Sequence, residues 1–322
     1  MPRHRRGLQI SGGLHASGVV PEDNDALGSI STEPPFLGYI VIVSERSLLV
    51  VDADSAVHEL VLNALHREDR KIQNAYDGPE ALECLRAEAY DLVLAGAGRN
   101  GFDSMKLLRK MRAIRPDTKV IVTGEPNAAK ALDAIRGRAY SYFHKPLQAV
   151  PLAEMVHQAL ECSSWQNDVK VISARKEWIG LEVRCKLEAA DRAVHLLGEL
   201  EIDMAPEVWE DVSSAFRELL LNAIEHGGKG DARKRVQVGV LRTAKALIVH
   251  LQDPGKGFSL EKLQHSALAN PDDDPTRHVE IRQEQGQRPG GFGILMARNL
   301  VDELLYNERG NEVVFVKYRG GL

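Results

Sequence analysis

Short β-branched runs alternate with helical patterns along the first half of the chain, and this alternation limits the possible folds more than any other feature of the sequence. Runs such as Leu48–Val51 and Val120–Val122 have the length of strands, and stretches such as Val57–Leu65 have helical spacing. The alternation predicts βαβ units, and therefore an α/β fold with a doubly wound parallel sheet. A helical stretch from about Val150 to Cys162 closes this unit, which we expect over residues 45–162.

The second half of the chain predicts a different architecture, an α+β sandwich with one antiparallel sheet covered by helices. It is expected over residues 176–322, after a polar linker over 163–175. A long helix ends at the pair Gly227-Gly228, which is typical of a glycine C-cap. The expected elements are a strand over Trp178–Leu187, helices over Ala189–Leu200 and Val208–His226, strands over Arg235–Val240 and Ala246–Gln252, a helix over Gly293–Leu304, and strands near Leu305 and over Glu312–Tyr318.

Composition sets further limits. Residues 1–44 carry Gly, Ser, Pro and mixed charge without apolar periodicity, so we expect a disordered tail there. The basic start, Met1–Arg6, lacks a following apolar core and does not resemble a secretion signal. The longest apolar stretches, such as Tyr39–Val43, are far shorter than the ~20 residues of a membrane span.

Charge and cysteine usage argue against further classes of protein. The chain has 41 Lys and Arg against 46 Asp and Glu, a net charge of −5, which argues against binding of nucleic acid or an anionic membrane through bulk charge. Three cysteines, Cys84, Cys162 and Cys185, fit neither a disulfide framework nor a zinc site with close ligand pairs. We therefore expect a cytoplasmic protein.

Glu218 and Asn222 share one face of the long helix, because they are four residues apart. An Asn carbonyl oxygen can be one hard ligand of an octahedral Mg²⁺ whose other ligands are waters and phosphate oxygens. Glu218, one turn earlier, could then take a proton from an attacking hydroxyl. On this fragment alone, a solvated Glu and Asn on an amphipathic helix is the simpler interpretation.

Two glycine-rich segments follow. Asp253-Pro254-Gly255-Lys256-Gly257 comes at the end of an apolar strand, where a carboxylate can accept a hydrogen bond from an exocyclic amine such as that of adenine. Alone, this segment is also an ordinary turn. Gly290–Met296 opens a helix at Gly291 and Gly293, and backbone N–H groups at such a helix start can bind an anion.

Together, these segments resemble the N, G1 and G2 boxes of the GHKL ATPase superfamily, and within it the anti-sigma-factor serine kinases. The resemblance covers roughly residues 175–322. It implies that Glu218 is the general base, that Asn222 holds Mg²⁺ and that Asp253 reads adenine. It also implies that glycines shape the ATP pocket, namely Gly255, Gly257, Gly291 and Gly293. The stretch 259–289 would be the ATP lid, and the Asp272–Asp274 run inside it is expected to be a solvated loop.

The first half resembles a two-component receiver domain over roughly 48–162. A buried strand delivers Asp52 and Asp54 at its carboxyl end, and two further strands are followed by Thr123 and Lys145. Ala53 replaces one of the usual acids. Gly96 stands where the resemblance requires the phosphoacceptor Asp, and glycine offers no nucleophile. We therefore expect a pseudo-receiver that has kept the fold and lost the switch, with Asp103 as a structural acid.

The run His58–Asn63 resembles a histidine-kinase phosphoacceptor motif, but it falls on the first helix of the receiver pattern. We therefore do not assign it that role.

The sequence predicts an ATP- and Mg²⁺-dependent serine/threonine kinase of the anti-sigma type with a degenerate receiver. Its expected partners are a small anti-sigma antagonist, a sigma factor, or both, and a homodimer is compatible with the resemblance. Direct contact with nucleic acid or membrane is not expected. Three alternatives stay open: a nucleotide-gated binding protein without phosphotransfer, a factor that only sequesters its partner, and a histidine kinase acting on His58 or on a separate protein.

Overall fold

A computed structural model of the chain describes residues 45–67, 69–96, 103–201, 204–257 and 293–319. All of these residues belong to one compact unit, Val43–Leu322, and this unit contains two β-sheets. The predicted tail over 1–44, which includes Tyr39–Val43, lies outside the described residues. Among the described residues, no helix is both long and apolar enough to cross a bilayer.

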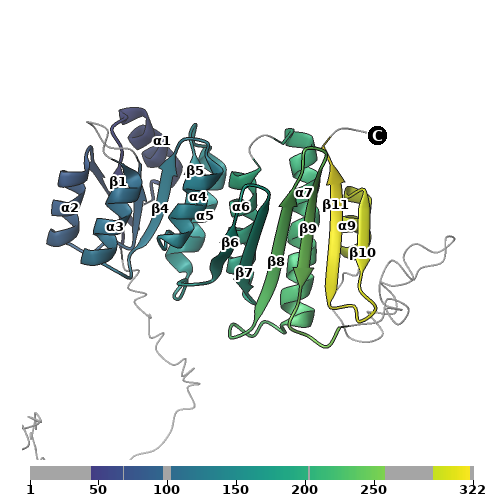
Figure 1. Cartoon of the computed structure of the whole chain (residues 1–322). Coiled ribbons are helices and arrows are strands. Elements are labelled where there is room, and N and C mark those ends of the chain that lie inside the picture. The colour runs from purple at the N-terminus through teal and green to yellow at the C-terminus, as the bar shows by residue number, and fades with distance from the viewer. Residues whose placement is uncertain (1–44, 68, 97–102, 202–203, 258–292, 320–322) are drawn as a thin grey trace, which may run out of the picture. The chain divides into compact units, whose positions relative to one another are not determined.

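The first sheet has five parallel strands in the order β2-β1-β3-β4-β5 (Figure 1). This order confirms the predicted doubly wound parallel sheet, because the chain reverses direction across the sheet after β2. Its elements are β1 (Arg46–Val51), α1 (Ser55–Leu65), β2 (Arg70–Ala75), α2 (Gly78–Ala87), β3 (Leu92–Ala95), α3 (Ser104–Ile114), β4 (Lys119–Gly124), α4 (Ala128–Arg136), β5 (Ser141–His144) and α5 (Ala149–Glu161).

Helices cover both faces of this sheet, as the apolar runs require. Along β1, Leu48 and Val50 face one side with α1 and α5, and Leu49 and Val51 face the other side with α2, α3 and α4. All four side chains are buried, so the strand reads as a continuous apolar run. The carboxyl ends of β1, β3, β4 and β5 therefore lie along one edge.

The second sheet is antiparallel, in the order β10-β11-β9-β8-β7-β6. Figure 1 shows α6, α7 and α9 along one face of it. Its elements are β6 (Val169–Ala174), β7 (Trp178–Arg184), α6 (Leu187–Leu200), α7 (Pro206–Asn222), a π-helical turn (Ala223–Gly227), β8 (Arg235–Arg242), β9 (Ala246–Gln252), α9 (Gly293–Leu300), β10 (Glu303–Tyr306) and β11 (Glu312–Tyr318). The predicted α+β sandwich is confirmed.

Two elements of the second half differ from the prediction. Strand β6 lies inside the stretch 163–175, which we expected to be a linker. It is only six residues long, four of them apolar, and it pairs with β7 at the edge of the second sheet. The long helix stops being α-helical after Asn222 and ends in one π-turn, a feature that leaves no clear trace in periodicity and often lies at functional sites.

Helix α6 contacts the end of β5 in the first sheet. The buried carboxylate of Glu199 accepts hydrogen bonds from the backbone N–H of His144 (3.1 Å) and contacts its imidazole Nδ1 (3.0 Å). His195 Nε2 donates to the carbonyl oxygen of Tyr142 (2.8 Å), and Arg192 Nε donates to that of Tyr140 (3.0 Å). Because β5 ends at His144, this contact lies one residue before Lys145, a predicted site residue.

Candidate functional site

The predicted receiver residues meet where strands β1, β3, β4 and β5 end. Lys145 Nζ donates to both oxygens of Asp52, at 2.9 and 2.7 Å. Asp52 is buried, so this pair is shielded from solvent screening on the side of its carboxylate. The positive charge that Lys145 brings to the pocket is thus already neutralised by a side chain of the protein.

Gly96 lies directly against this pair. A Cβ built on Gly96 would overlap the carboxylate of Asp52 and come within 2.8 Å of Thr123 Oγ1. The Asp52 carboxylate therefore fills the space that an acceptor side chain at position 96 would need. The hydroxyl of Thr123 is buried and has no hydrogen-bond partner among the described residues. This geometry has room for neither the acceptor nor its phosphate.

Three further residues have local roles. Asp54 is exposed and caps α1 by accepting from Ala56 N (2.9 Å), so its side chain serves the helix rather than the pocket. Asp103 caps α3 in the same way, which fits a structural acid. His58 is buried, and its Nε2 contacts the carbonyl oxygen of Asp52 at 2.9 Å. A buried imidazole that is engaged in this way is not presented to a kinase.

The second site forms where α7 meets the start of α9. Glu218 and Asn222 are both half-buried on α7, and Gly293 is the first residue of α9. A Cβ on Gly293 would lie 2.6 Å from Glu218 Oε2 and 3.6 Å from Asn222 Nδ2. The absence of a side chain at 293 thus keeps both polar groups free at a helix N-terminus, where a phosphate is favoured.

The π-turn that follows Asn222 ends next to Asp253. Gly227 ends this turn, and a Cβ there would overlap the Asp253 carboxylate. Asp253 follows β9 and is fixed by two bonds: its N–H donates to Asn311 O (2.9 Å), and its Oδ1 accepts from Gly255 N (2.6 Å). Burial raises the pKa of the Asp253 carboxyl. Oδ2 has no hydrogen-bond partner among the described residues, so it can accept one from a ligand amine.

The turn after Asp253 needs a glycine at position 257. Gly257 has a φ of +80°, and a Cβ there would overlap the carbonyl oxygen of Arg309. Arg309 Nε in turn donates to the carbonyl oxygen of Lys256 at 3.2 Å. The loop between β10 and β11 thus holds the Asp253–Gly257 turn in place.

Some parts of the predicted ATP site lie outside the described residues, namely Gly291, the expected lid over 259–289 and the Asp272–Asp274 run within it. In the described ranges there is no group of three or more His, Cys, Asp or Glu side chains with the spacing of a metal site.

Sequence reasoning missed two contributors to this site. Gly227 was predicted only as a helix C-cap, although it lies against Asp253. Arg309 gave no signal, because its contact with the Asp253–Gly257 turn depends on strand pairing. The pair Gly227-Gly228 was the one available hint, since two successive glycines are more than a C-cap requires.

Comparison with known protein families decides what the two halves are. Residues 183–317 match the family described as a histidine kinase-like ATPase domain, and residues 48–157 match the response regulator receiver domain. The chain joins a receiver domain to a histidine kinase-like ATPase domain. The predicted GHKL-plus-receiver architecture is confirmed. The ATPase domain implies that the chain binds ATP, and its combination with a receiver domain indicates a signalling regulator.

The similarity to curated relatives covers only part of each relative's length. The transcriptional regulatory protein ZraR of Salmonella typhimurium is 31% identical over 162 residues, which is 50% of this chain and 35% of that protein. The response regulator MprA of Mycobacterium ulcerans is 23% identical over 179 residues, 55% of this chain and 68% of that protein. The receiver domain of NtrX from Brucella abortus, a solved structure, is 31% identical with a TM-score of 0.34, and the match covers 36% of this chain and 99% of that one. The chain thus spans about a third of the length of the ZraR proteins.

Proposed function

We propose that the ATPase domain transfers the γ-phosphate of ATP to a serine or threonine hydroxyl on a small protein partner of the anti-sigma-antagonist type. The observation that carries this proposal is the placement of the Glu218 carboxylate and the Asn222 amide together against Gly293. A general base, a metal-holding amide and an anion-binding helix start are the parts that phosphoryl transfer to a hydroxyl requires.

In the proposed reaction, Glu218 takes the proton of the partner hydroxyl as its oxygen forms a bond to the γ-phosphorus. The bond between that phosphorus and the β–γ bridging oxygen breaks, and ADP leaves. Asn222 would hold the Mg²⁺ that neutralises charge on the phosphates. Asp253 would accept a hydrogen bond from the adenine amine through Oδ2.

Two observations favour a hydroxyl over a histidine as the acceptor. His58 is buried and in contact with a backbone carbonyl oxygen. The chain passes from α5, which ends at Glu161, to β6, which starts at Val169, in seven residues. These residues cannot form the helical hairpin that would present a phosphoacceptor histidine next to the ATPase domain.

The receiver domain is proposed as a regulatory module that works without phosphorylation. The Asp52–Lys145 pair and the missing side chain at Gly96 support this role. A partner that carries the substrate hydroxyl, with or without a sigma factor, and a homodimer are part of the same proposal.

The test is to incubate the purified chain with Mg²⁺ and ATP labelled on the γ-phosphate in a lysate of its source cells. An acid-stable, alkali-labile label on a small protein, absent with Glu218→Gln, would support a serine or threonine kinase. An acid-labile label would move the assignment to histidine chemistry. No label, with ATP still bound, would favour a nucleotide-gated binding protein.

A further inference from the structure

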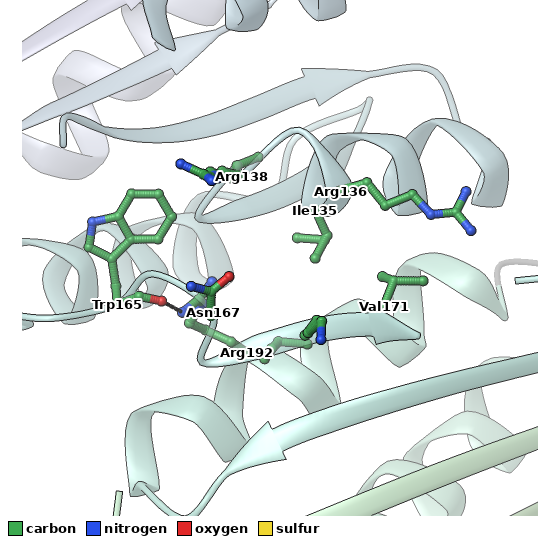
Figure 2. Close-up of a pocket in the computed structure, with 10 residues that line it drawn as sticks. Ile135, Arg136, Arg138, Trp165, Asn167, Val171 and Arg192 are labelled. Atoms are coloured by element: carbon green, nitrogen blue, oxygen red, sulfur yellow. Dashed lines mark hydrogen bonds between the residues drawn. The ribbon is translucent and has the colours of Figure 1, made fainter. Parts of the chain in front are cut away.

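A cavity of about 230 Å³ lies between the end of helix α4 and strand β6 (Figure 2). Ile135 and Arg138 belong to one wall, from the receiver domain, and Asn167 and Val171 belong to the facing wall. The indole of Trp165 closes one end. We call this cavity the junction pocket. Its lining includes none of the predicted residues of the two sites described above.

The lining of the junction pocket carries only positive charge. Four of its ten lining residues are basic, namely Arg136, Arg138, Lys170 and Arg192, and none is acidic. Arg136 contacts Asp133 at 3.4 Å and Lys170 contacts Glu182 at 3.8 Å, and these long pairs involve largely exposed side chains. Exposed pairs of this kind neutralise little of the local potential. Arg138 has no ion-pair partner among the described residues.

The positive charge of Arg192, a buried lining residue, is also only partly neutralised by a carboxylate. The buried guanidinium of Arg192 donates to the carbonyl oxygens of Tyr140 and Trp165. Its nearest carboxylate, Asp168 at 3.7 Å, is shared with Lys186 at 3.1 Å and Arg184 at 3.8 Å. One negative charge therefore faces three cations, and a negatively charged ligand in the pocket would supply what is missing.

A second guanidinium, that of the half-buried Arg112, adds to this excess. Arg112 lies over the Trp165 ring at 5.1 Å, and its hydrogen bonds all go to carbonyl oxygens, those of Pro116, Thr118 and Arg138. Burial and the charge of Arg138 lower the pKa of Arg112 to about 10, and the carboxylate of Asp117 opposes this shift. Arg112 therefore stays charged at neutral pH, and no carboxylate forms an ion pair with it among the described residues.

Backbone conformation also singles out residues on both walls of the junction pocket. Arg138 has a φ of +64° and Asn167 a φ of +61°, two of the three non-glycine residues with positive φ in the described chain. Arg138 follows the end of α4, where glycine is the favoured residue. Gly137, one position earlier, has an ordinary negative φ. The chain thus places an arginine, at a conformational cost, where a glycine would be more stable.

We propose that the junction pocket binds a small phosphate-bearing anion, of the size of phosphate or diphosphate. Arginine guanidinium groups match phosphate oxygens with paired hydrogen bonds, and the volume exceeds that of one tetrahedral anion. Because its walls belong to α4 and to β6, the bound anion would join the receiver domain to the ATPase domain. A receiver that cannot be phosphorylated would in this way still respond to a chemical signal.

The test is calorimetric titration of diphosphate into the full chain carrying Asn222→Ala, without Mg²⁺, so that binding at the ATP site is suppressed. We expect saturable binding with one site per chain. Arg138→Gly and Lys170→Ala should each weaken it roughly tenfold or more, because each removes a charge-assisted contact. Arg175→Ala, which removes one exposed charge from the same hairpin outside the pocket, should leave it unchanged.

Arg138→Gly also separates binding from folding. The variant keeps the carbonyl oxygen that Arg112 contacts and relieves the positive φ, so its melting temperature without ligand should rise. Absence of saturable diphosphate binding would overturn the proposal, as would binding that Arg138→Gly leaves intact. Equal affinity for succinate would overturn the phosphate assignment, since a dicarboxylate without a phosphate group would then suffice.

Discussion

The carboxylate of Asp52 occupies the space in which a side chain at Gly96 would lie. Lys145 Nζ binds both oxygens of that carboxylate, at 2.9 and 2.7 Å. In this receiver domain, a partly buried ion pair thus stands where a side chain at position 96 would lie.

Restoring the acceptor should therefore fail. Gly96→Asp would bring two carboxylates together in a buried pocket and overpack it, so we expect the free energy of unfolding to fall by about 2 kcal/mol or more. The variant should gain no phosphate from acetyl phosphate. Denaturant unfolding and intact-mass measurement check both points. Adding Asp52→Ala should restore much of the stability, because it removes the overlapping carboxylate. A stable Gly96→Asp single variant that becomes phosphorylated would show that the pocket is merely vacant.

The pair of Lys145 and Asp52 should be strongly coupled. Lys145→Met leaves a buried carboxylate without its partner, and we expect a loss of about 2–3 kcal/mol, because Lys145 is partly solvent-accessible. Asp52→Asn combined with Lys145→Met should cost clearly less than the sum of the single changes. A double-mutant cycle measured by urea unfolding gives this coupling energy. Additive effects would mean that the pair contributes nothing beyond its separate members.

Stability should fall in mild acid because of His195. Burial, with a smaller contribution from the nearby His144, lowers the pKa of its imidazole to about 4, although the hydrogen bond to Tyr142 opposes this shift. The folded state thus favours neutral His195, so its contribution is complete above pH ~6.5 and is lost as the pH falls toward ~4. At pH 5 the loss should be about 2 kcal/mol. Glu199, which faces both histidines and whose carboxyl pKa is raised by burial, acts in the opposite direction.

The variant His195→Gln isolates this effect, since an amide can keep the donor to Tyr142 O but does not titrate. Urea unfolding of both proteins between pH 7 and pH 5 should show the advantage of the wild type shrinking with acidity. A difference that stays constant over this range would exclude His195 as the titrating group.

The turn after Asp253 should tolerate no side chain at position 257. Gly257→Ala combines a φ of +80° with overlap against the Arg309 carbonyl oxygen, so we expect weaker ATP binding by tenfold or more. Gly230→Ala is the matched control, because Gly230 also has a positive φ of +63° but has no atom within 4 Å of a Cβ. Calorimetric titration with ATP should separate the two variants. Equal, small effects in both would show that the overlap relaxes without disturbing the site.

Much of the architecture could be predicted from periodicity. The buried runs at Leu48–Val51 and Val120–Val122 indicated parallel strands, and alternating burial along β7 fits an antiparallel sheet with one covered face. Strand β2 was not predicted, because its sequence, Arg70–Ala75, is mostly polar at the edge of the sheet. Strand β6 was expected to be part of a linker because it is short and directly follows the polar stretch 163–168.

The candidate sites, too, could be predicted only in part from the sequence. Residue type and spacing pointed to Glu218, Asn222 and Asp253, since helical and strand-end positions follow from the sequence. The direction of Asp54, which caps its own helix, and the overlap between Gly96 and Asp52 depend on side-chain geometry. The contact of Glu199 with His144 joins residues 55 positions apart, and neither residue alone indicates it.

The measurement that tests the central claim most directly compares ATP binding with phosphate transfer in the wild type, Glu218→Gln and Asn222→Ala. If Glu218 is the general base beside an ATP site, Glu218→Gln should bind ATP within about threefold of the wild type and lose 10²-fold or more of its transfer rate. Asn222→Ala should lose Mg²⁺-dependent ATP binding itself. Transfer by Glu218→Gln at the wild-type rate would contradict the proposed role of this carboxylate, and ATP binding unaffected by Asn222→Ala would contradict the placement of the nucleotide.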